Sequence, residues 1–468
     1  MGWTDDELYA RSLARDDRLD GRVYMAVHTT GIYCRLSCTA RKPKREHVTF
    51  FRDEAAARAA GFRPCRRCRP DAPGEDRELD GLEALLARIH AEPEAYRTVD
   101  DLAAALGCGA TALGDRFRRH GLPSPAQVLA AARVDRLADR LAEGGATVLE
   151  AALDAGFESL SAANDRFRRQ LALSPGAWRK LGSGHELVLA LPGGYRAEDT
   201  LAFHGRDPQS ACEQVEGSTL VKALEADGRA VRLTFVFTDG QVRVRAEEPI
   251  RPHHAAVRRM LGLHLDPTPF ERAVGGAFAR ILRPGLRLPQ TADGWEALVW
   301  AILGQQVNLA FAYALRRDLV ARFGLPLGNG RYAHPGPARL AQAEVGELTA
   351  LRLSRAKAET LLRAAQTAAA GCLDLEALRL GTATRAEGVL RTIKGIGPWT
   401  ARYVLLRGLG FGDVVPAGDA GLALALQRHH NLDHRPDAAE TEALLAAFSP
   451  WRSFAVYHLW ASLKGSPA

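Results

Sequence analysis

Two close pairs of cysteines constrain the fold of this chain more than any other feature. The first pair is Cys34 and Cys38, and the second pair, Cys65 and Cys68, follows after 26 residues. Each pair can supply two corners of a tetrahedron, so four reduced cysteines with this spacing predict a zinc site. We therefore expect a small zinc domain near the N-terminus, in which the metal is either inert and structural or chemically active.

Charge and the character of the N-terminus narrow the class of protein. The opening MGWTDDELYARSLARDD is acidic and polar, unlike a secretory signal, so the thiols are expected to stay reduced. Residues 35–69 carry eleven Lys and Arg against three Asp and Glu, whereas the whole chain has a net charge of +7. Such a segment attracts a phosphate backbone, although a solvated basic face has the same composition.

Hydrophobic runs are too short to suggest a membrane protein. No apolar run reaches the roughly 18–20 residues that a membrane span needs. We therefore expect a cytoplasmic, nucleoid-associated protein with DNA as its partner and no membrane contact.

Changes of pattern along the 468 residues predict four domains, in a multidomain fold that is mainly α with α+β parts. Residues 1–75 hold the cysteines, and residues 76–182 show helical periodicity. Residues 185–272 are strand-rich, because RLTFVFTDGQVRVRA alternates apolar and polar residues on both sides of Asp239-Gly240. Residues 273–468 return to long amphipathic helices.

The helical block contains one duplicated unit, TVDDLAAALGCGATALGDRFRRHG at 98–121 and TVLEAALDAGFESLSAANDRFRRQLALSP at 147–175. Each unit predicts two short helices about a glycine turn, an arrangement that places the second helix in the major groove of DNA. Two helical hairpins packed in a core would show the same pattern. The candidate DNA-binding residues on the second helices are Arg116, Arg118, Arg166, Arg168 and Arg169.

The C-terminal half carries a glycine hairpin and an isolated carboxylate. Gly395 and Gly397 in KGIGPWTA allow a close approach of the backbone, and N–H groups exposed before a helix can hold a phosphate. A plain helix–helix turn is the alternative. Asp419, in DVVPAGDAGLAL, either caps the following helix or is a catalytic carboxylate held at that helix N-terminus.

The N-terminal motifs resemble a known family. GIYCRLSCTARKPKREHVTFF and AAGFRPCRRCRP are similar to the N-terminal domain of the Ada methylphosphotriester-repair and regulatory family. The resemblance implies that all four cysteines bind one zinc ion, which is structural and activating. It also implies that Cys34 takes a methyl group from a methylated DNA phosphate, which strengthens operator binding by removing one negative charge. Leu36 stands where the family usually has proline, and we expect it to loosen the turn between the first two ligands.

The second unit of the helical block, with GFESLS, RFRR and SPGAW, resembles AraC-type DNA-binding domains with two helix-turn-helix motifs. By this likeness Ala110–Arg119 and Ser159–Arg169 are the recognition helices. Promoter DNA is then one partner, and RNA polymerase is another.

The C-terminal half resembles the helix–hairpin–helix DNA glycosylase superfamily, and within it the AlkA-type 3-methyladenine glycosylases. The resemblance covers about residues 185–468, includes an AlkA N-terminal-like α+β domain, and is carried by GQQV, GIGPWTA, the carboxylate and PWRSFAVYHLW. It implies that Asp419 is catalytic in hydrolytic excision of alkylated purines such as 3-methyladenine, without a cofactor. Gly418 is Asp in some members, so a second carboxylate is missing.

Other positions of the glycosylase motif imply the product and the base pocket. Trp399 stands where lyase-competent relatives have lysine, so we expect an abasic product and no strand cleavage. The aromatic faces of Trp399, Tyr403 and Trp460 would bind a cationic base, unless these rings are ordinary core. Gln306 matches a position from which some relatives insert a wedge into the duplex.

The combined expectation is a fusion of an Ada-type sensor and regulator with an AlkA-type glycosylase. The tetrapeptide Pro-Cys-His-Arg is absent, so we expect no O6-methylguanine repair. One competing class is a transcription regulator whose glycosylase-like domain is inactive. Another is a zinc-stabilised DNA-binding protein with no chemistry at Cys34.

Overall fold

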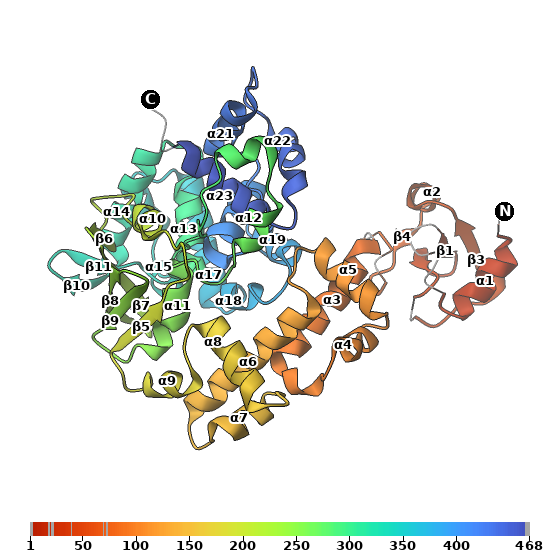
Figure 1. Cartoon of the computed structure of the whole chain (residues 1–468). Helices are drawn as coiled ribbons and strands as arrows, with labels where there is room; N and C mark the ends of the chain where they lie inside the picture. Colours follow the sequence, from red (N-terminus) through yellow and green to blue (C-terminus); the bar gives the residue numbers. More distant parts are fainter. Residues whose placement is uncertain are drawn as a thin grey trace. The chain divides into compact units, whose positions relative to one another are not determined.

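The computed structural model describes residues 3–16, 19, 23–38, 40–68, 70–71 and 74–463. Arg69, the last residue of the basic segment, lies outside the described residues. The chain divides into two compact units, residues 1–84 and residues 85–468, with the boundary inside helix α3 (Gly74–Ala91). Figure 1 shows the elements of both units. No helix in the described part of the chain is both long and apolar enough to cross a membrane.

The first unit is built on a four-stranded sheet in the order β3-β1-β2-β4. Strand β1 pairs antiparallel with β2 and β3, whereas β4 pairs parallel with β2. Tyr24 and Tyr33 meet edge to face with their ring centroids 5.8 Å apart and form part of its small core. The elements are α1 (Asp5–Leu13), β1 (Tyr24–Val27), β2 (Ile32–Arg35), β3 (Val48–Phe51), α2 (Glu54–Ala59) and β4 (Arg63–Pro64).

The second unit begins with two helix-turn-helix motifs that have the same local design. The first helices, α4 and α7, start with capping boxes at Thr98 and Thr147, which satisfy backbone N–H groups at each helix N-terminus. The second helices, α5 and α8, bury Phe117 and Phe167 completely. The elements are α4 (Val99–Ala105), α5 (Ala110–Arg119), α6 (Pro125–Glu143), α7 (Val148–Asp154), α8 (Leu160–Leu171) and α9 (Pro175–Lys180).

An antiparallel five-stranded sheet follows, in the order β5-β9-β8-β7-β6. The predicted hairpin is confirmed, since β8 and β9 are joined by Asp239-Gly240 and Thr238 pairs with Gln241. Gly240 has a φ of +68°, which favours glycine at this turn. The elements are β5 (Glu186–Ala190), α10 (Ala197–His204), β6 (Glu213–Glu216), β7 (Thr219–Ala226), β8 (Arg229–Thr238), β9 (Gln241–Ala246) and α11 (His254–Met260).

The remaining residues form two apolar clusters that support the C-terminal helices. One cluster is centred on α13, α17 and α20, and the other on α21 and α23. A π-helical turn, Leu405–Leu409, continues α20. The elements are α12 (Thr268–Ala273), α13 (Gly294–Leu303), α14 (Leu309–Phe323), β10 (Leu325–Gly328), β11 (Arg331–Ala333), α15 (Pro337–Leu340), α16 (Val345–Ala350), α17 (Arg355–Ala369), α18 (Leu375–Leu378), α19 (Ala383–Arg391), α20 (Pro398–Val404), α21 (Ala420–His430), α22 (Ala438–Leu445) and α23 (Arg452–Ser462).

Buried charges join the five-stranded sheet to helices α13 and α14. Lys222 of β7 is fully buried, and its Nζ lies 2.7 Å from Glu296 Oε1 and 3.1 Å from Glu213 Oε1. Arg316 of α14 also pairs with both carboxylates. Burial alone would raise the pKa of Glu296, but Lys222 and Arg316 lower it to about 2. The network therefore stays ionised, with two cations opposite two anions.

We predict that Lys222→Met destabilises the protein strongly. The substitution leaves two buried carboxylates with one arginine, Arg316, and the neighbouring His204. Breaking a buried ion pair in this way costs about 3–5 kcal/mol. Urea unfolding followed by tryptophan fluorescence measures the loss. Arg243→Met is the matched control, because Arg243 pairs with Glu186 at an exposed position and its loss should cost at most about 1 kcal/mol. Equal effects of the two substitutions would contradict the prediction.

Candidate functional site

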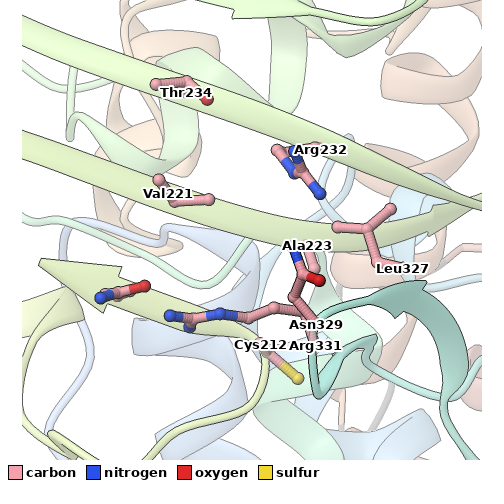
Figure 2. Close-up of a pocket in the computed structure, with 9 residues that line it drawn as sticks. Cys212, Val221, Ala223, Arg232, Thr234, Leu327, Asn329 and Arg331 are labelled. Carbon is pink, nitrogen blue, oxygen red and sulfur yellow. The ribbon is translucent and has the colours of Figure 1, made fainter.

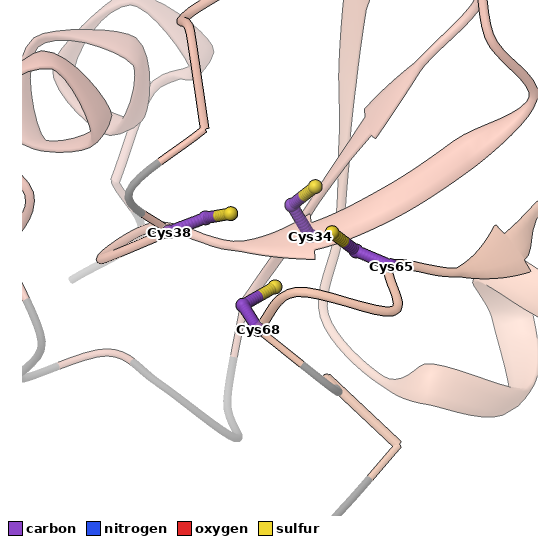
Figure 3. Close-up of side chains that lie close together, drawn as sticks. All are labelled: Cys34, Cys38, Cys65 and Cys68. Atoms are coloured by element: carbon purple, nitrogen blue, oxygen red, sulfur yellow. The ribbon is translucent and has the colours of Figure 1, made fainter.

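The four predicted metal ligands form one compact cluster in the first unit (Figure 3). The sulfur atoms of Cys34, Cys38, Cys65 and Cys68 all lie within 4.8 Å of one another. All four residues are buried, with exposures of 2–8%. The predicted convergence of the two pairs is therefore confirmed.

Parallel pairing of β2 with β4 brings the two cysteine pairs together. Cys34 lies on β2, and Cys65, directly after β4, donates its backbone N–H to the carbonyl of Tyr33 at 3.0 Å. The backbone N–H of Arg35 donates to the Cys68 sulfur at 3.4 Å. Backbone hydrogen bonds thus hold the two cysteine pairs beside each other.

Leu36 does not leave the first turn open. The backbone N–H of Cys38 donates to the carbonyl of Arg35 at 3.2 Å and closes the turn. Leu36 itself is completely buried and packs with Leu8 and Val23. The expected loosening is absent because an apolar contact takes over the anchoring.

The chemistry of the cluster fits zinc. Four sulfur donors at tetrahedral spacing, with Zn–S bonds of about 2.3 Å, are typical of structural zinc sites. Hydrogen bonds from the thiols of Cys34 and Cys68 lower the pKa of Cys38 to about 2, so a thiolate is favoured within the cluster. We conclude that this unit is a zinc-binding domain with Cys34, Cys38, Cys65 and Cys68 as the ligand set.

The predicted recognition helices coincide with α5 and α8. Helix α5 spans the predicted Ala110–Arg119, and α8 begins after its N-cap Ser159 and ends two residues beyond Arg169. Arg118, Arg166, Arg168 and Arg169 are exposed, and Arg116 is half-buried. Arg118 and Arg169 form ion pairs with Asp115 and Asp165 on their own helices, at 2.9 and 3.0 Å.

Asp419 is the N-cap of α21, and three N–H groups donate to its carboxylate. The backbone N–H of Leu422 donates to Oδ1 at 2.8 Å. The indole N–H of Trp460 donates to the same oxygen at 3.1 Å, and the indole of Trp399 donates to Oδ2 at 3.2 Å. The capping interpretation is confirmed, and it is compatible with a second role, because the cap uses only one of the three bonds.

Two glycines shape the surroundings of Asp419. A Cβ atom on Gly421 would lie 3.3 Å from Asp419 Oδ1, which is a tight contact, and 3.7 Å from Trp460 Nε1, so its absence leaves room for the carboxylate. Gly418 has a φ of +87°, a left-handed backbone conformation that favours glycine.

The three predicted pocket rings are half-buried, and two of them, Trp399 and Trp460, contact Asp419 directly. The ring centroids of Trp399 and Tyr403 are 5.6 Å apart, and those of Tyr403 and Trp460 are 6.5 Å apart. Trp399 and Tyr403 come from α20, whereas Trp460 comes from α23. Each ring is partly exposed, and Tyr403 and Trp460 also pack against the two apolar clusters. The role of these rings in a base pocket therefore stays a prediction.

The glycine hairpin before α20 is tightly constrained on one side. Gly395 has a φ of +100°, and a Cβ atom there would lie 2.0 Å from Thr360 Oγ1. Gly397 is exposed, and a Cβ atom there would meet nothing within 4 Å. Both glycines are exposed, but Gly395 allows its backbone to approach Thr360 closely, whereas Gly397 has open space beside it.

Gln306 is exposed on the loop between α13 and α14, in the left-handed backbone conformation with a φ of +52°. Gln305 fixes this loop, because its Nε2 donates to the carbonyl of Gly395 and to Thr400 Oγ1, each at 3.0 Å. Sequence reasoning missed Gln305. The adjacent glutamines in GQQV were the available signal, since Gln306 is exposed and Gln305 is fixed by hydrogen bonds.

A separate hollow of about 420 Å³ lies between the five-stranded sheet and the hairpin of β10 and β11 (Figure 2). Arg232 and Arg331 line it together with smaller residues such as Val221 and Ala223. It contains none of the site residues predicted from the sequence.

Comparison with known proteins identifies three family segments. Residues 7–71 match the metal binding domain of Ada, and residues 102–181 match a helix-turn-helix domain. Residues 299–450 match the HhH-GPD superfamily base excision DNA repair proteins. These matches confirm the predicted fold class, with a zinc domain, a helix-turn-helix region and a helix–hairpin–helix glycosylase fold.

Individual relatives match separate parts of the chain. The bifunctional transcriptional activator/DNA repair enzyme Ada of Escherichia coli is 34% identical over 40% of this chain and 52% of its own length. The structure of a 3-methyladenine DNA-glycosylase from Archaeoglobus fulgidus is 25% identical, with a TM-score of 0.53, over 59% of this chain and 98% of that chain.

One relative matches nearly the entire chain. A probable bifunctional transcriptional activator/DNA repair enzyme AlkA from Mycobacterium tuberculosis is 31% identical over 98% of this chain and 96% of its own. Identity at this level over nearly the full length of both chains means that the relative shares the order of domains along the chain. The chain therefore belongs to the family of bifunctional transcriptional activator/DNA repair enzymes of the AlkA type.

Proposed function

We propose that this protein both senses and repairs alkylation damage in DNA. Residues 1–75 would accept a methyl group from a DNA methylphosphotriester, and residues 76–182 would bind promoter DNA. Residues 185–272 and 273–468 would together excise alkylated purines such as 3-methyladenine. The observation that carries the proposal is the carboxylate of Asp419 held between the indole N–H groups of Trp399 and Trp460.

The methyl acceptor in this proposal is Cys34. A bound zinc ion keeps its sulfur ligands deprotonated. The Cys34 sulfur then attacks the methyl carbon of the phosphotriester, the carbon–oxygen bond breaks, and the phosphate leaves as an ordinary phosphodiester anion. Cys34 becomes a thioether that holds the methyl group permanently, so each protein molecule reacts once. Loss of one negative charge lowers the repulsion between this unit and DNA phosphates.

The regulatory step in this proposal is binding of α5 and α8 to an operator. Their exposed arginines, such as Arg118 and Arg168, would contact phosphates or base edges. We infer that the methylated protein then promotes transcription by contact with RNA polymerase. A protein with these DNA contacts would be associated with the nucleoid.

The repair reaction in this proposal is hydrolysis of the N-glycosidic bond. Alkylation at N3 or N7 makes a purine cationic and a good leaving group. The flipped base would stack on Trp399, Tyr403 and Trp460, where each cation–π contact contributes about 0.5–2 kcal/mol. Asp419 would stabilise the positive charge that develops on the sugar as water attacks. With Trp399 in place of a nucleophilic lysine, the product is an abasic site and the strand stays intact.

We predict that Asp419→Asn abolishes base release. Asparagine still accepts the N-cap hydrogen bond from Leu422, so α21 should fold, but the negative charge is lost. The single-turnover rate on DNA containing 3-methyladenine should fall by at least about 100-fold. Equal rates for wild type and variant would reject Asp419 as the catalytic group. A wild-type protein that releases no base at all would favour a regulator with an inactive glycosylase domain.

We predict that Cys34 alone gains a methyl group from methylphosphotriester DNA. Mass spectrometry of the treated protein should show one addition of about 14 Da, located on Cys34. Cys34→Ser should remove the addition, whereas Cys372→Ser, a change at an exposed cysteine outside the cluster, should leave it unchanged. Intact zinc binding without any methyl adduct would favour an inert zinc domain.

We predict different effects for the two hairpin glycines. Gly395→Ala should lower the thermal midpoint, since its Cβ atom collides with Thr360 and its φ is unfavourable for alanine. Gly397→Ala should leave the midpoint unchanged but weaken binding of lesion-containing DNA, because the added methyl occupies the open side of the hairpin. Calorimetry and a filter-binding assay separate the two. Unchanged DNA affinity of the Gly397 variant would place the DNA elsewhere.

A further inference from the structure

Three aromatic rings, one of which is hydrogen-bonded to Asp419, contact the side chain of an arginine. Arg407 lies on the π-helical turn that continues α20. Its guanidinium carbon is 4.0 Å from the ring centroid of Tyr457, 4.6 Å from that of Trp460 and 4.7 Å from that of Phe203. Contact with three rings, one from α10 and two from α23, suits the planar guanidinium, whose stacking on a ring face lysine does not reproduce.

The charge of Arg407 has no ionic partner. Within the described part of the chain, no carboxylate lies within 4.0 Å of its nitrogens. Its Nε and Nη1 are buried without a hydrogen-bond acceptor. The hydroxyl of Tyr457, on one of the three rings, donates to the carbonyl of Pro289 at 2.7 Å, and its oxygen also interacts with the Arg407 side chain. Such unpaired buried donors are rare in proteins and call for a functional or structural reason.

The backbone of Arg407 is fixed from outside its own helix. Its carbonyl accepts hydrogen bonds from the backbone N–H and the hydroxyl of Thr291, at 3.1 and 3.2 Å. Single π-helical turns of this kind occur frequently at functional sites. The guanidinium is therefore carried by a rigid element, which suits a group that must hold another side chain in place.

One of the three rings is hydrogen-bonded to the candidate catalytic carboxylate. Trp460 stacks with Arg407 through its ring, and its indole N–H donates to Asp419 Oδ1 at 3.1 Å. The orientation of this ring decides whether the N–H points at the carboxylate. A guanidinium held against the ring limits that orientation.

We propose that Arg407 is a positioning residue of the glycosylase site, which holds Trp460 so that its indole N–H orients Asp419. The inference rests on the proposed role of Asp419. Arg407 acts through Trp460 and touches neither base nor sugar. Loss of Arg407 should therefore slow base release more than it weakens binding of lesion-containing DNA, since the rings of Trp399 and Tyr403 still bind the base.

A double-mutant cycle in the full-length protein tests this inference. Arg407→Met should lower the single-turnover rate about ten-fold, the scale of one lost cation–π contact. In a Trp460→Phe background, which keeps a ring but lacks the N–H, the same change should cost less than about two-fold. Arg407→Lys should not restore the wild-type rate, because the ammonium cannot stack as a plane. Equal costs in both backgrounds, or full rescue by lysine, would overturn the inference.

Arg206→Met is the matched control. The guanidinium carbon of Arg206 lies 4.3 Å from the ring centroid of Phe203 and 5.2 Å from that of Trp300. Among the described residues, Arg206 has no carboxylate partner and does not stack on Trp460. Its loss removes a similar stacking contact and should change the rate by less than about two-fold. A ten-fold loss in this variant as well would mean that general packing, and not Trp460, explains the effect.

A second readout does not depend on catalysis. The indole N–H resonance of Trp460 in a ¹H–¹⁵N spectrum, assigned by its absence in Trp460→Phe, should shift in Arg407→Met and also in Asp419→Asn. An unmoved resonance in Arg407→Met would reject the inference even if the protein released no base. Conversely, a shifted resonance in an inactive protein would leave the positioning role in place and reject only the proposed reaction.

Discussion

The position of the Asp419 carboxylate depends on hydrogen bonds from residues of three helices. Its oxygens accept N–H groups from α20, α21 and α23, through Trp399, Leu422 and Trp460. Each donor reaches the carboxylate only if its helix begins at the right residue and packs at the right distance. The glycine hairpin sets the start of α20, Asp419 itself sets the start of α21, and the apolar cluster between α21 and α23 places Trp460. The candidate active site is thus a consequence of helix capping and helix packing together.

In the thiol cluster, the pairing of strands positions the functional groups. The C-x3-C and C-x2-C pairs are each local, but only the parallel pairing of β2 with β4 brings all four sulfurs within 4.8 Å. Backbone N–H groups of Arg35 and Cys65 make the bonds that fix this pairing. Spacing in the sequence predicts the ligands because each pair sits on one tight turn, whereas the pairing of the two turns is a property of the fold.

How far the sequence predicts the structure depends on the range of the interaction. Helix α5 coincides with the predicted Ala110–Arg119, and the Asp239-Gly240 hairpin forms as expected, because caps, turns and alternation act over a few residues. Gln305 and Arg407 were not predicted. Their contacts lie in other elements, such as Gly395 for Gln305 and Phe203 for Arg407. The π-helical turn at Leu405–Leu409 changes which side chains share a helix face, and the hydrophobic pattern of the sequence did not predict this turn.

The negative charge that the proposed reaction needs at Asp419 explains why its hydrogen-bond donors are neutral. No cation pairs with this carboxylate among the described residues, and its three donors are two indoles and one backbone amide. A paired arginine would orient the carboxylate but would also cancel the field that the proposed reaction needs beside a developing sugar cation. Neutral N–H groups orient it and leave its charge intact. Arg407 fits this logic, because its guanidinium contacts the ring of Trp460 and acts on the carboxylate only across the indole.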